Sequence, residues 1–272
     1  HETALLLWKE LARGSGLLRW AMVNKNGETV RGPEMLDGVN CCGAYTCGRN
    51  GSGFILCAED WADGRVTLKR WRITETTWSE LPDMPVESAF AARPFFCAEP
   101  DGGYLLGWEE YEPERGYRIR TLLSGADRET VADVPGERGW WDTLGTAAVT
   151  HDGNWYLACC HDRLVRLQNA AETHDTRIRT FQSDGAGNWS PAGDVDINYA
   201  LNPRLSPYCG CRRRAWLCPR SEGGMWLTWE EKEGYYAGHP GAGHLAGSIL
   251  TEKGLRSEKI ELLRPRSNCY VR

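Results

Sequence analysis

Cys97-Ala-Glu-Pro-Asp-Gly-Gly-Tyr104-Leu-Leu106 is the stretch of sequence that decides the fold. It reads as the end of one strand, a tight Gly-rich turn and the start of a second strand, which is typical of a β-hairpin. Three further segments align with it without gaps, and they begin at Cys47, Ala148 and Cys218. After each second strand the sequence becomes polar and often acidic, as at Glu59-Asp60, Glu109-Glu110 and His161-Asp162, and loops are predicted over residues 59–64, 109–116 and 160–162. The chain is therefore built from an internal repeat.

A fifth copy of this repeat is split between the two ends of the chain. Ala4-Leu-Leu-Leu-Trp8-Lys-Glu10 matches Tyr104-Leu-Leu-Gly-Trp108-Glu-Glu110, and Ser267-Asn-Cys269-Tyr-Val-Arg272 supplies the missing first strand. If Arg272 is joined to His1, Cys269 precedes Ala4 by seven positions, which is also the interval from Cys97 to Tyr104. We therefore predict that strands from both termini pair in one blade and close a ring, because closure protects sheet edges.

The spacing of the repeat predicts the fold class. Equivalent positions fall at Ala4, Phe54, Tyr104, Trp155 and Met225, at intervals of 50, 50, 51 and 70 residues. This period predicts an all-β, five-bladed β-propeller with four-stranded blades, as a single domain over residues 1–272. The predicted blades are residues 267–272 with 1–38, then 39–87, 88–136, 137–197 and 198–266. The long last interval predicts an insertion around 169–175 or 198–213, and a fragment of a larger propeller is the alternative.

The rest of each blade fits two outer strands. The second and third blades are expected to place them at Arg65–Thr74, Thr77–Leu81, Tyr117–Ser124 and Glu129–Val134. No segment of ten or more residues has a helical period.

Composition narrows the classes of partner. The net charge of −5 argues against a nucleic-acid or anionic-membrane partner. No stretch approaches the roughly 18 apolar residues of a membrane span, and no cofactor motif is present. The start of the chain lacks the basic and apolar regions of a signal peptide. A secreted or periplasmic location is favoured only if His1 follows a removed leader.

The sequence contains eleven cysteines, an odd number that excludes complete pairing within one chain. We interpret most of them as small buried side chains. Cys47, Cys97, Cys218 and Cys269 share one repeat position and are expected to fill the core. Cys41-Cys42 and Cys209-x-Cys211 lack the usual spacing of zinc ligands, so no metal site is predicted.

Three carboxylates are the candidate catalytic residues. Loops that converge on one face of a propeller are the expected place for a ligand, and a glycoside hydrolase needs two carboxyl groups about 5–10 Å apart. Asp142 ranks first because it enters an innermost strand directly after Trp140-Trp141, with Glu109 and Glu230 as candidate partners. In the alternative interpretation, the Trp-Glu pairs only maintain the repeat, with tryptophan packed between blades and glutamate solvated at the rim.

Aromatic and basic residues complete the candidate ligand site. Tryptophan and tyrosine rings can stack on sugars, and arginine binds carboxylate or phosphate in a bidentate manner. The candidate ligand-binding residues are Trp140, Trp141, Trp61, Tyr235, Tyr236, Arg93, Arg138 and Arg214. Solvated arginines are the alternative for the basic residues. Trp8, Trp108 and Trp229 occupy equivalent strand positions and are expected in the core.

These repeats resemble the five-bladed β-propeller class, which includes arabinanase-type and invertase-type glycosidases and tachylectin-like lectins. Ser183-Asp-Gly-Ala-Gly-Asn-Trp189 is similar to a sialidase Asp-box but differs in its Asp-to-Gly spacing. No catalytic motif of these families is matched, so the resemblance implies an architecture and no catalytic residue. We expect a carbohydrate-binding propeller, with a glycan or small polar ligand over the central channel, and hydrolysis is left open. The alternative is a protein-interaction or structural propeller without catalysis.

Overall fold

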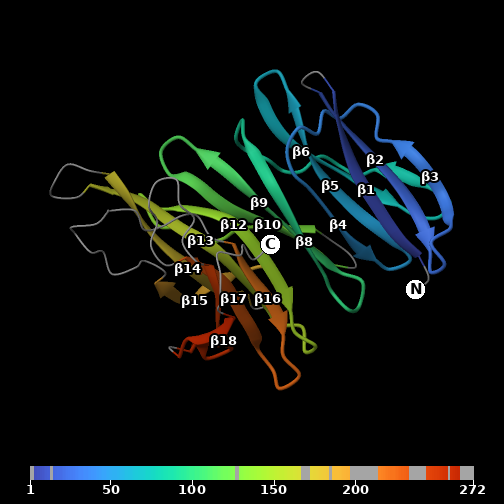
Figure 1. Ribbon diagram of the computed structural model, residues 1–272. Helices are drawn as coiled ribbons and strands as arrows, with labels where there is room; N and C mark the ends of the chain where they lie inside the picture. The colour runs from blue at the N-terminus through green and yellow to red at the C-terminus, as the bar shows by residue number, and fades with distance from the viewer. Residues whose placement is uncertain are drawn as a thin grey trace. The chain divides into compact units, whose positions relative to one another are not determined.

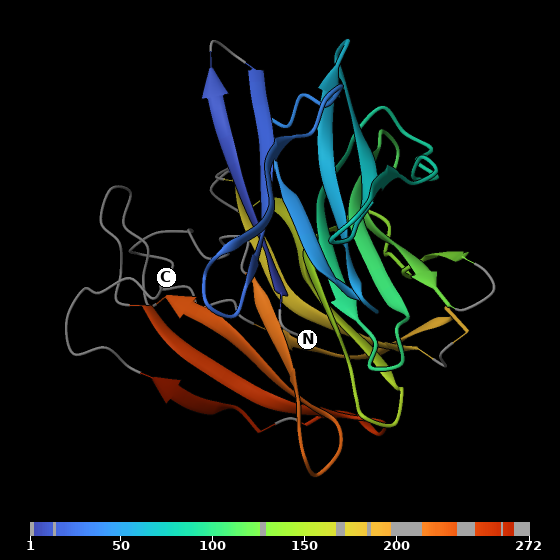
Figure 2. The ribbon, with the colours of Figure 1, turned by 90° about the vertical axis from the view of Figure 1, so that its right-hand side faces the viewer.

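The computed structural model describes residues 3–12, 15–125, 129–166, 172–183, 186–196, 214–232, 243–256 and 258–263. Throughout these residues the regular secondary structure is β only. The strands form five antiparallel sheets, and Figures 1 and 2 show them as successive groups along the chain. The prediction of an all-β fold is therefore confirmed. Among the described residues, no helix is both long enough and apolar enough to cross a bilayer.

The first two sheets cover residues up to Glu80. The first contains β1 (Thr3–Ala12), β2 (Ser15–Asn24) and β3 (Thr29–Met35), in that order. The second contains β4 (Tyr45–Asn50), β5 (Gly53–Ala62), β6 (Arg65–Ile73) and β7 (Trp78–Glu80). The strand that was predicted to extend the first sheet, Ser267–Arg272, lies outside the described residues, so closure of the ring stays a prediction.

The other three sheets follow in chain order. The third contains β8 (Ala91–Ala98), β9 (Tyr104–Glu112), β10 (Gly116–Ser124) and β11 (Glu129–Asp133). The fourth contains β12 (Trp141–Val149), β13 (Trp155–Arg166), β14 (Glu172–Ser183) and β15 (Trp189–Asp196). The fifth contains β16 (Ala215–Pro219), β17 (Met225–Lys232), β18 (Gly243–Thr251) and β19 (Gly254–Leu255), with β20 (Ile260–Leu263) also paired to β18.

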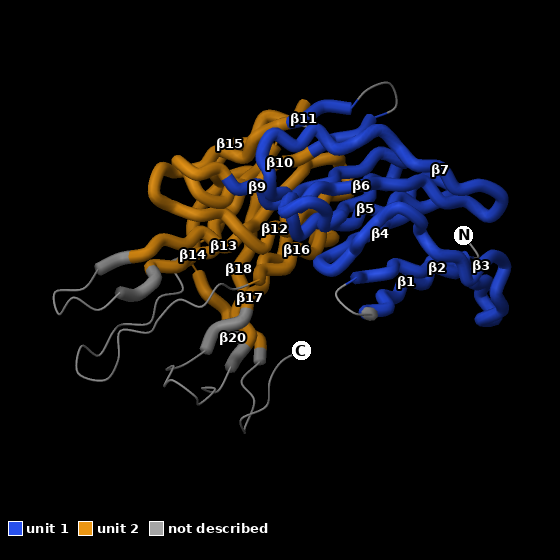
Figure 3. The backbone as a smooth tube through the Cα atoms, turned by 90° about the horizontal axis from the view of Figure 1, so that it is seen from above, with its two compact units in different colours: residues 1–111, 122–131 blue, residues 112–121, 132–272 orange. Residues whose placement is uncertain are grey.

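The chain divides into two compact units, coloured in Figure 3. The first unit comprises residues 1–111 and 122–131, and the second comprises residues 112–121 and 132–272.

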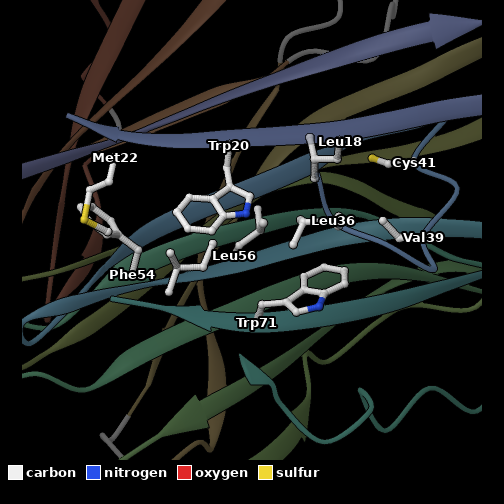
Figure 4. Close-up of a cluster of buried hydrophobic side chains, with 11 residues drawn as sticks. Leu18, Trp20, Met22, Leu36, Val39, Cys41, Phe54, Leu56 and Trp71 are labelled. Carbon is white, nitrogen blue, oxygen red and sulfur yellow. The ribbon is translucent and has the colours of Figure 1, made fainter. Parts of the chain in front are cut away.

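Buried tryptophans organise the core of the first unit. Trp20 of β2 and Trp71 of β6 are at most 1% exposed, and Leu56 of β5 lies between their strands. Figure 4 shows the two indoles entering this cluster from opposite sides. A second cluster is built around Trp108 of β9, and the second unit has a cluster around Trp229 of β17. Trp108 and Trp229 are fully buried as predicted, whereas Trp8 is only half-buried.

Hairpin turns determine where the strands end, and they correct one expectation. Asp63 and Gly64 have φ angles of 51° and 72° between the paired residues Ala62 and Arg65. Two positive φ angles make a type I′ turn, whose twist matches that of the flanking strands. The strand therefore continues through Glu59, which was predicted to begin a loop. The acidic positions after the second strands lie within longer strands.

The predicted outer strands are confirmed with shifts of a residue or so at their ends, as β6, β7, β10 and β11. One core prediction is wrong. Cys218 is exposed because it lies one residue before the end of β16, beside the turn that leads to β17. Cys47 and Cys97 are partly buried, and Cys269 lies outside the described residues. The eight described cysteines carry free thiols.

Candidate functional site

A cavity of about 950 Å³ lies in the second unit, against the chain that leads from β11 into β12. Three candidate residues of the sequence analysis, Arg138, Trp140 and Asp142, line it. The remaining lining residues are Glu114, Arg115, Tyr117, Arg118, Asp133, Val134, Pro135, Gly136 and Glu137. Aromatic rings and groups of both charges therefore face one cavity, which we call the Asp142 cavity.

The entry to β12 is shaped by a local turn. The Trp140 amide donates a hydrogen bond to the Glu137 carbonyl over 3.1 Å, and Gly139 has a φ of 82°. A glycine with positive φ at the third position is the requirement of a type II turn. Glu137-Arg138-Gly139-Trp140 meets it, so the local sequence itself presents Glu137 and Trp140 next to Asp142.

Asp142 is held by two groups from the neighbouring strand. It lies directly opposite His161 in the β12–β13 register, and residues paired in this way project their side chains to the same face. The Asp142 Oδ1 atom lies 2.7 Å from His161 Nδ1, and it accepts a hydrogen bond from the Cys159 thiol over 3.6 Å. Burial raises the pKa of Cys159 well above its usual value, and the Asp142 charge raises it further. Cys159 therefore stays protonated and donates to a carboxylate that is only 2% exposed.

His161 is fully buried and connects two carboxylates. Its Nδ1 atom faces Asp142, and its Nε2 atom lies 3.7 Å from Glu137 Oε2 without a hydrogen bond. Buried polar atoms without a partner are rare in folded proteins and call for an explanation. The neighbouring Glu137 carboxylate is 54% exposed and lines the same cavity.

Trp140 covers His161 and has little surface left for a ligand. The two rings stack with centroids 4.1 Å apart and an interplanar angle of 5°. The guanidinium carbons of Arg163 and Arg177 lie 4.4 and 5.1 Å from the Trp140 ring centroid, within the range of cation–π contacts. Trp140 is 5% exposed. The expected open stacking platform is therefore replaced by a ring that encloses His161 and only borders the cavity.

The Trp141 side chain points away from that of Trp140, because successive side chains in a strand point to opposite faces. Its ring meets Tyr117 edge-on, with centroids 6.3 Å apart and an interplanar angle of 79°. Gly116 lies so close that a Cβ there would be 2.2 Å from the Trp141 ring. Trp141 therefore supports the cavity indirectly, by packing beside the lining residue Tyr117.

Arginines fix the acidic lining residues. Arg179 donates to Glu137 over 3.2 Å and to both Asp194 oxygens over 3.0 Å. Burial lowers the pKa of Arg179, but the hydrogen bonds to Asp194 and Glu137 and the charges of Asp194 and Asp142 outweigh it and raise the pKa overall. Arg118 and Arg120 hold Asp133 over 3.2 and 2.8 Å. Arg138 also lines the cavity, and its side chain forms no ion pair or hydrogen bond within the described part of the chain.

In the first unit, Arg93 links two buried glutamates. Its backbone amide donates to Glu59 Oε1 over 2.8 Å, and its Nη1 atom donates to Glu109 Oε2 over 2.6 Å. Glu59 Oε2 also accepts from Trp61 Nε1 over 2.8 Å. Glu59 is 3% exposed and Glu109 is fully buried, so neither is solvated at the rim. Three predicted residues, Arg93, Glu109 and Trp61, thus meet around Glu59.

The unusual backbone of Arg93 belongs to the repeat. Arg93 has a φ of 50° at a bulge between Ala92 and Phe95, and Leu144 has a φ of 54° at the equivalent bulge in β12. Non-glycine residues with positive φ often mark functional sites. Because Leu144 is apolar, the recurrence shows that the bulge is an architectural feature, which Arg93 uses to orient its amide and side chain.

The remaining predicted residues fall in several places. Glu230 belongs to β17, but its side chain is outside the described part, as are Tyr235 and Tyr236. Arg214 is exposed directly before β16. Glu109 belongs to the first unit and Asp142 to the second. No group of three or more His, Cys, Asp or Glu side chains suited to a metal ion occurs among the described residues.

Sequence reasoning missed Glu137 and ranked His161 only among many polar residues. A usable signal for Glu137 was the Pro135-Gly136-Glu137-Arg138-Gly139 run, because turn residues directly before an innermost strand place a side chain at its mouth. For His161 the signal was its repeat position, where the equivalent residues are Asp60 and Glu110. The Asp60 carboxylate accepts a hydrogen bond from the backbone amide of Asn40, and the Glu110 carboxylate accepts from those of Glu87 and Ser88. His161 instead contacts Asp142.

Comparison with known proteins identifies the fold. No protein-family model matches the sequence, and no curated protein matches it. A glycoside hydrolase family 32 β-fructofuranosidase from Bombyx mori is similar in structure, with a TM-score of 0.51 and 10% identity over 96% of this chain and 60% of that enzyme. An α-L-arabinanase from Penicillium chrysogenum, complexed with arabinobiose, has a TM-score of 0.51 and 10% identity over 93% of this chain and 88% of that enzyme. At this identity the similarity shows a propeller-like fold alone.

Proposed function

We propose that this chain is a carbohydrate-binding propeller that holds a glycan in the Asp142 cavity. The observation that carries the proposal is the buried Asp142 carboxylate, held by His161 and Cys159 at the wall of a cavity of about 950 Å³. Ligand sites are typically cavities of about 300–1,000 Å³ with a few fixed polar groups. A carboxylate held in this way can accept hydrogen bonds from sugar hydroxyls without reorganising.

The lining chemistry supports a polyhydroxylated ligand. Tyr117 and Trp140 offer ring edges, and Glu137 and Arg138 add one acceptor and one donor at the same cavity. Arg138 is free of protein partners among the described residues and is the cation best placed to meet a ligand oxygen. The similarity in fold to two solved carbohydrate enzymes supports the same class of ligand.

Hydrolysis is the finer part of the proposal. Asp142 and Glu137 contact opposite nitrogens of His161 over 2.7 and 3.7 Å, so one imidazole ring spans the gap between them. Glycosidases act with two carboxyl groups about 5–10 Å apart. If the bound glycan is cleaved, Glu137, which is more exposed, is placed to exchange protons with solvent, and Asp142 is the fixed carboxylate. Glu109, Arg93 and Trp61 stay candidates for additional ligand contacts.

Asp142→Asn tests the proposal. Asparagine keeps the size of the side chain and one oxygen for His161, but it removes the charge. We expect the affinity for the bound glycan to fall at least tenfold, about 1.4 kcal/mol, and any glycan hydrolysis to be lost. The measurements are a glycan-array screen of the purified chain, calorimetric titration with the best glycan, and chromatography of the products.

Asp37→Asn is the matched control, because it is the same substitution at an exposed residue outside the cavity. Both variants should unfold at temperatures close to that of the parent chain. If no glycan binds the parent chain, or Asp142→Asn binds as well as Asp37→Asn, the proposal is wrong. A protein-interaction role would then become the leading interpretation, to be followed by pull-down of partners.

The sequence also leads us to propose that residues 267–272 complete the first blade as its innermost strand. The proposal is supported by the gapless repeat that continues across the joined termini. Deleting residues 267–272 should lower the free energy of unfolding by about 3 kcal/mol, since burying one or two apolar side chains contributes about that much. Cys269→Asp should do likewise and Cys269→Val should not. Urea unfolding measures the three variants, and a deletion variant and a Cys269→Asp variant as stable as the parent chain would contradict closure.

A further inference from the structure

Two adjoining cavities lie at the other end of the β12–β13 hairpin from Asp142. They have volumes of about 340 and 520 Å³ and share Asn154, Tyr156 and Glu252. Val149, next to the hairpin turn, lies seven positions after Asp142 in β12, which at about 3.3 Å per residue is roughly 23 Å. We call the two cavities together the Tyr156 groove. It uses none of the residues of the Asp142 cavity.

Tyr156 is the feature that points to a ligand. It is 2% exposed, yet it lines both cavities. Among the described residues its hydroxyl has no hydrogen-bond partner, although a buried tyrosine hydroxyl normally has one. Burial, followed by the charges of Asp152 and Glu252, raises the pKa of Tyr156, so the group is a protonated donor. The one part of this side chain that is not packed is therefore a donor that faces an open groove.

Local hydrogen bonds hold two of the residues that line the groove beside this hydroxyl. Asn154 is held in the turn by two hydrogen bonds. Its backbone N–H donates to Thr150 Oγ1 over 3.0 Å, and its side-chain Nδ2 donates to Asp152 over 2.9 Å. Trp189 is 7% exposed and is anchored by a 2.9 Å hydrogen bond from its Nε1 to Thr121 Oγ1. A site held by packing and local hydrogen bonds loses little entropy when a ligand binds.

The lining chemistry indicates the class of ligand. The smaller cavity adds the amides and hydroxyls of Gln182, Ser183, Asn188 and Ser190. The larger cavity is lined by three acidic side chains and three basic ones, Asp152, Glu222, Glu252, Arg220, Lys253 and Arg256. Equal numbers of opposite charges give no net preference for an anion or a cation. Paired donors and acceptors around an aromatic floor match the hydroxyl groups of a neutral sugar.

We propose that the Tyr156 groove is a second binding site, for one or two residues of a neutral oligosaccharide. The Tyr156 hydroxyl donates a hydrogen bond to a sugar oxygen, and the Glu252 carboxylate accepts from a sugar hydroxyl. Amides of the smaller cavity contact the adjoining sugar. The chain would then hold a glycan at two places on one unit, which increases the apparent affinity for long chains over short ones.

Tyr156→Phe is the sharpest test, because it removes only the hydroxyl. The full chain and its variants would be titrated calorimetrically with neutral tri- to hexasaccharides of glucose, xylose, arabinose and fructose. We expect two sites in the parent chain, and at least tenfold weaker binding at one of them in Tyr156→Phe. Glu252→Gln should weaken the same site, and Glu258→Gln, an exposed glutamate beyond the groove, is the matched control.

The variants separate this proposal from that for the Asp142 cavity. Asp142→Asn should leave the site that is sensitive to Tyr156→Phe unchanged, so failure of one proposal does not affect the other. Because the hydroxyl has no partner in the described structure, Tyr156→Phe should not lower the unfolding temperature. Unchanged binding in Tyr156→Phe, or no binding of any of these oligosaccharides to the Asp142→Asn chain, would overturn the second site.

Discussion

Replacing Arg70 by methionine is expected to destabilise the protein by about 2–3 kcal/mol, because it removes charge-assisted hydrogen bonds to Glu129, a partner whose side chain is 38% exposed and can still be hydrated. Arg70 lies on β6 with 1% of its side chain exposed. It holds both Glu129 oxygens, over 2.5 and 2.7 Å, and donates to the Pro82 carbonyl over 3.0 Å. Methionine fills a similar volume, so the decrease in the free energy of unfolding measures what the charge and the hydrogen bonds of Arg70 contribute.

The substitution leaves Glu129 without the guanidinium that binds both of its carboxylate oxygens. Among the described residues, its carboxylate would keep the Tyr104 hydroxyl as a donor, over 3.3 Å, and water would reach its exposed part. Arg70→Met combined with Glu129→Leu removes both charges and should recover most of the stability, because an apolar pair can replace a buried ion pair at little cost. Urea unfolding followed by tryptophan fluorescence measures all three free energies.

The control for Arg70 is an ion pair that is open to solvent. Arg19 and Glu10 pair over 2.9 Å with side chains 33% and 48% exposed. Arg19→Met should cost no more than about 1 kcal/mol, which is typical of exposed pairs. Equal losses in Arg70→Met and Arg19→Met, or a double variant as unstable as Arg70→Met, would contradict this account of the buried pair.

Gly16→Ala is expected to destabilise the first unit by about 3 kcal/mol, at the upper end of the cost of overpacking. A Cβ at Gly16 would lie 2.0 Å from the Cys41 carbonyl oxygen and 2.4 Å from its carbon. These are backbone atoms, so no side-chain rotation relieves the clash. The Cys41 amide donates to the Gly16 carbonyl over 2.8 Å, and the Gly16 amide donates to Asn40 over 2.8 Å.

The damage should extend to the loop that follows β3. Asn40 also donates its amide to Asp60 over 2.8 Å, and Lys9 donates to the Cys42 and Gly43 carbonyls over 3.0 and 2.8 Å. Moving the loop away from Gly16 would strain these contacts together. Hydrogen exchange of the amides of residues 40–43 should therefore become faster in Gly16→Ala.

Gly27→Ala is the control, because it tests backbone conformation without a clash. Gly27 has a φ of 81°, and a Cβ there would meet no atom within 4 Å. The left-handed conformation alone should cost about 1 kcal/mol. If Gly16→Ala lowers the free energy of unfolding in urea no more than Gly27→Ala does, the close approach of the backbone is not what requires glycine at position 16.

Much of the fold could be predicted from the sequence because hairpins are local. A strand, a turn and the next strand lie within about twenty residues, so the turn at Asp63-Gly64 and the alternation beside it specify register directly. The repeat then multiplied this local signal across the chain. Where the prediction erred, as in the loop expected at Glu59, the strands simply extended to the turn residues that were already visible.

The candidate site was predicted less completely. Asp142, Arg138 and Trp140, which lie within five residues of one another, were named as candidates, and the structure places all three at one cavity. Trp140 was expected to be open, but its ring stacks on His161 and lies beside Arg163. Burial of a loop tryptophan depends on cations and rings from other strands, which no pattern around residue 140 reveals.

The sequence by itself therefore determined the repeating β-hairpin, the outer strands of the second and third sheets, and the burial of Trp108 and Trp229. Tertiary structure alone decided the chemistry of the sites. His161 faces Asp142 from 19 positions away, and Arg70 meets Glu129 from 59 positions away. Periodicity controls which face of a strand is buried, whereas a partner across strands or sheets depends on packing that brings distant residues to within a few ångströms.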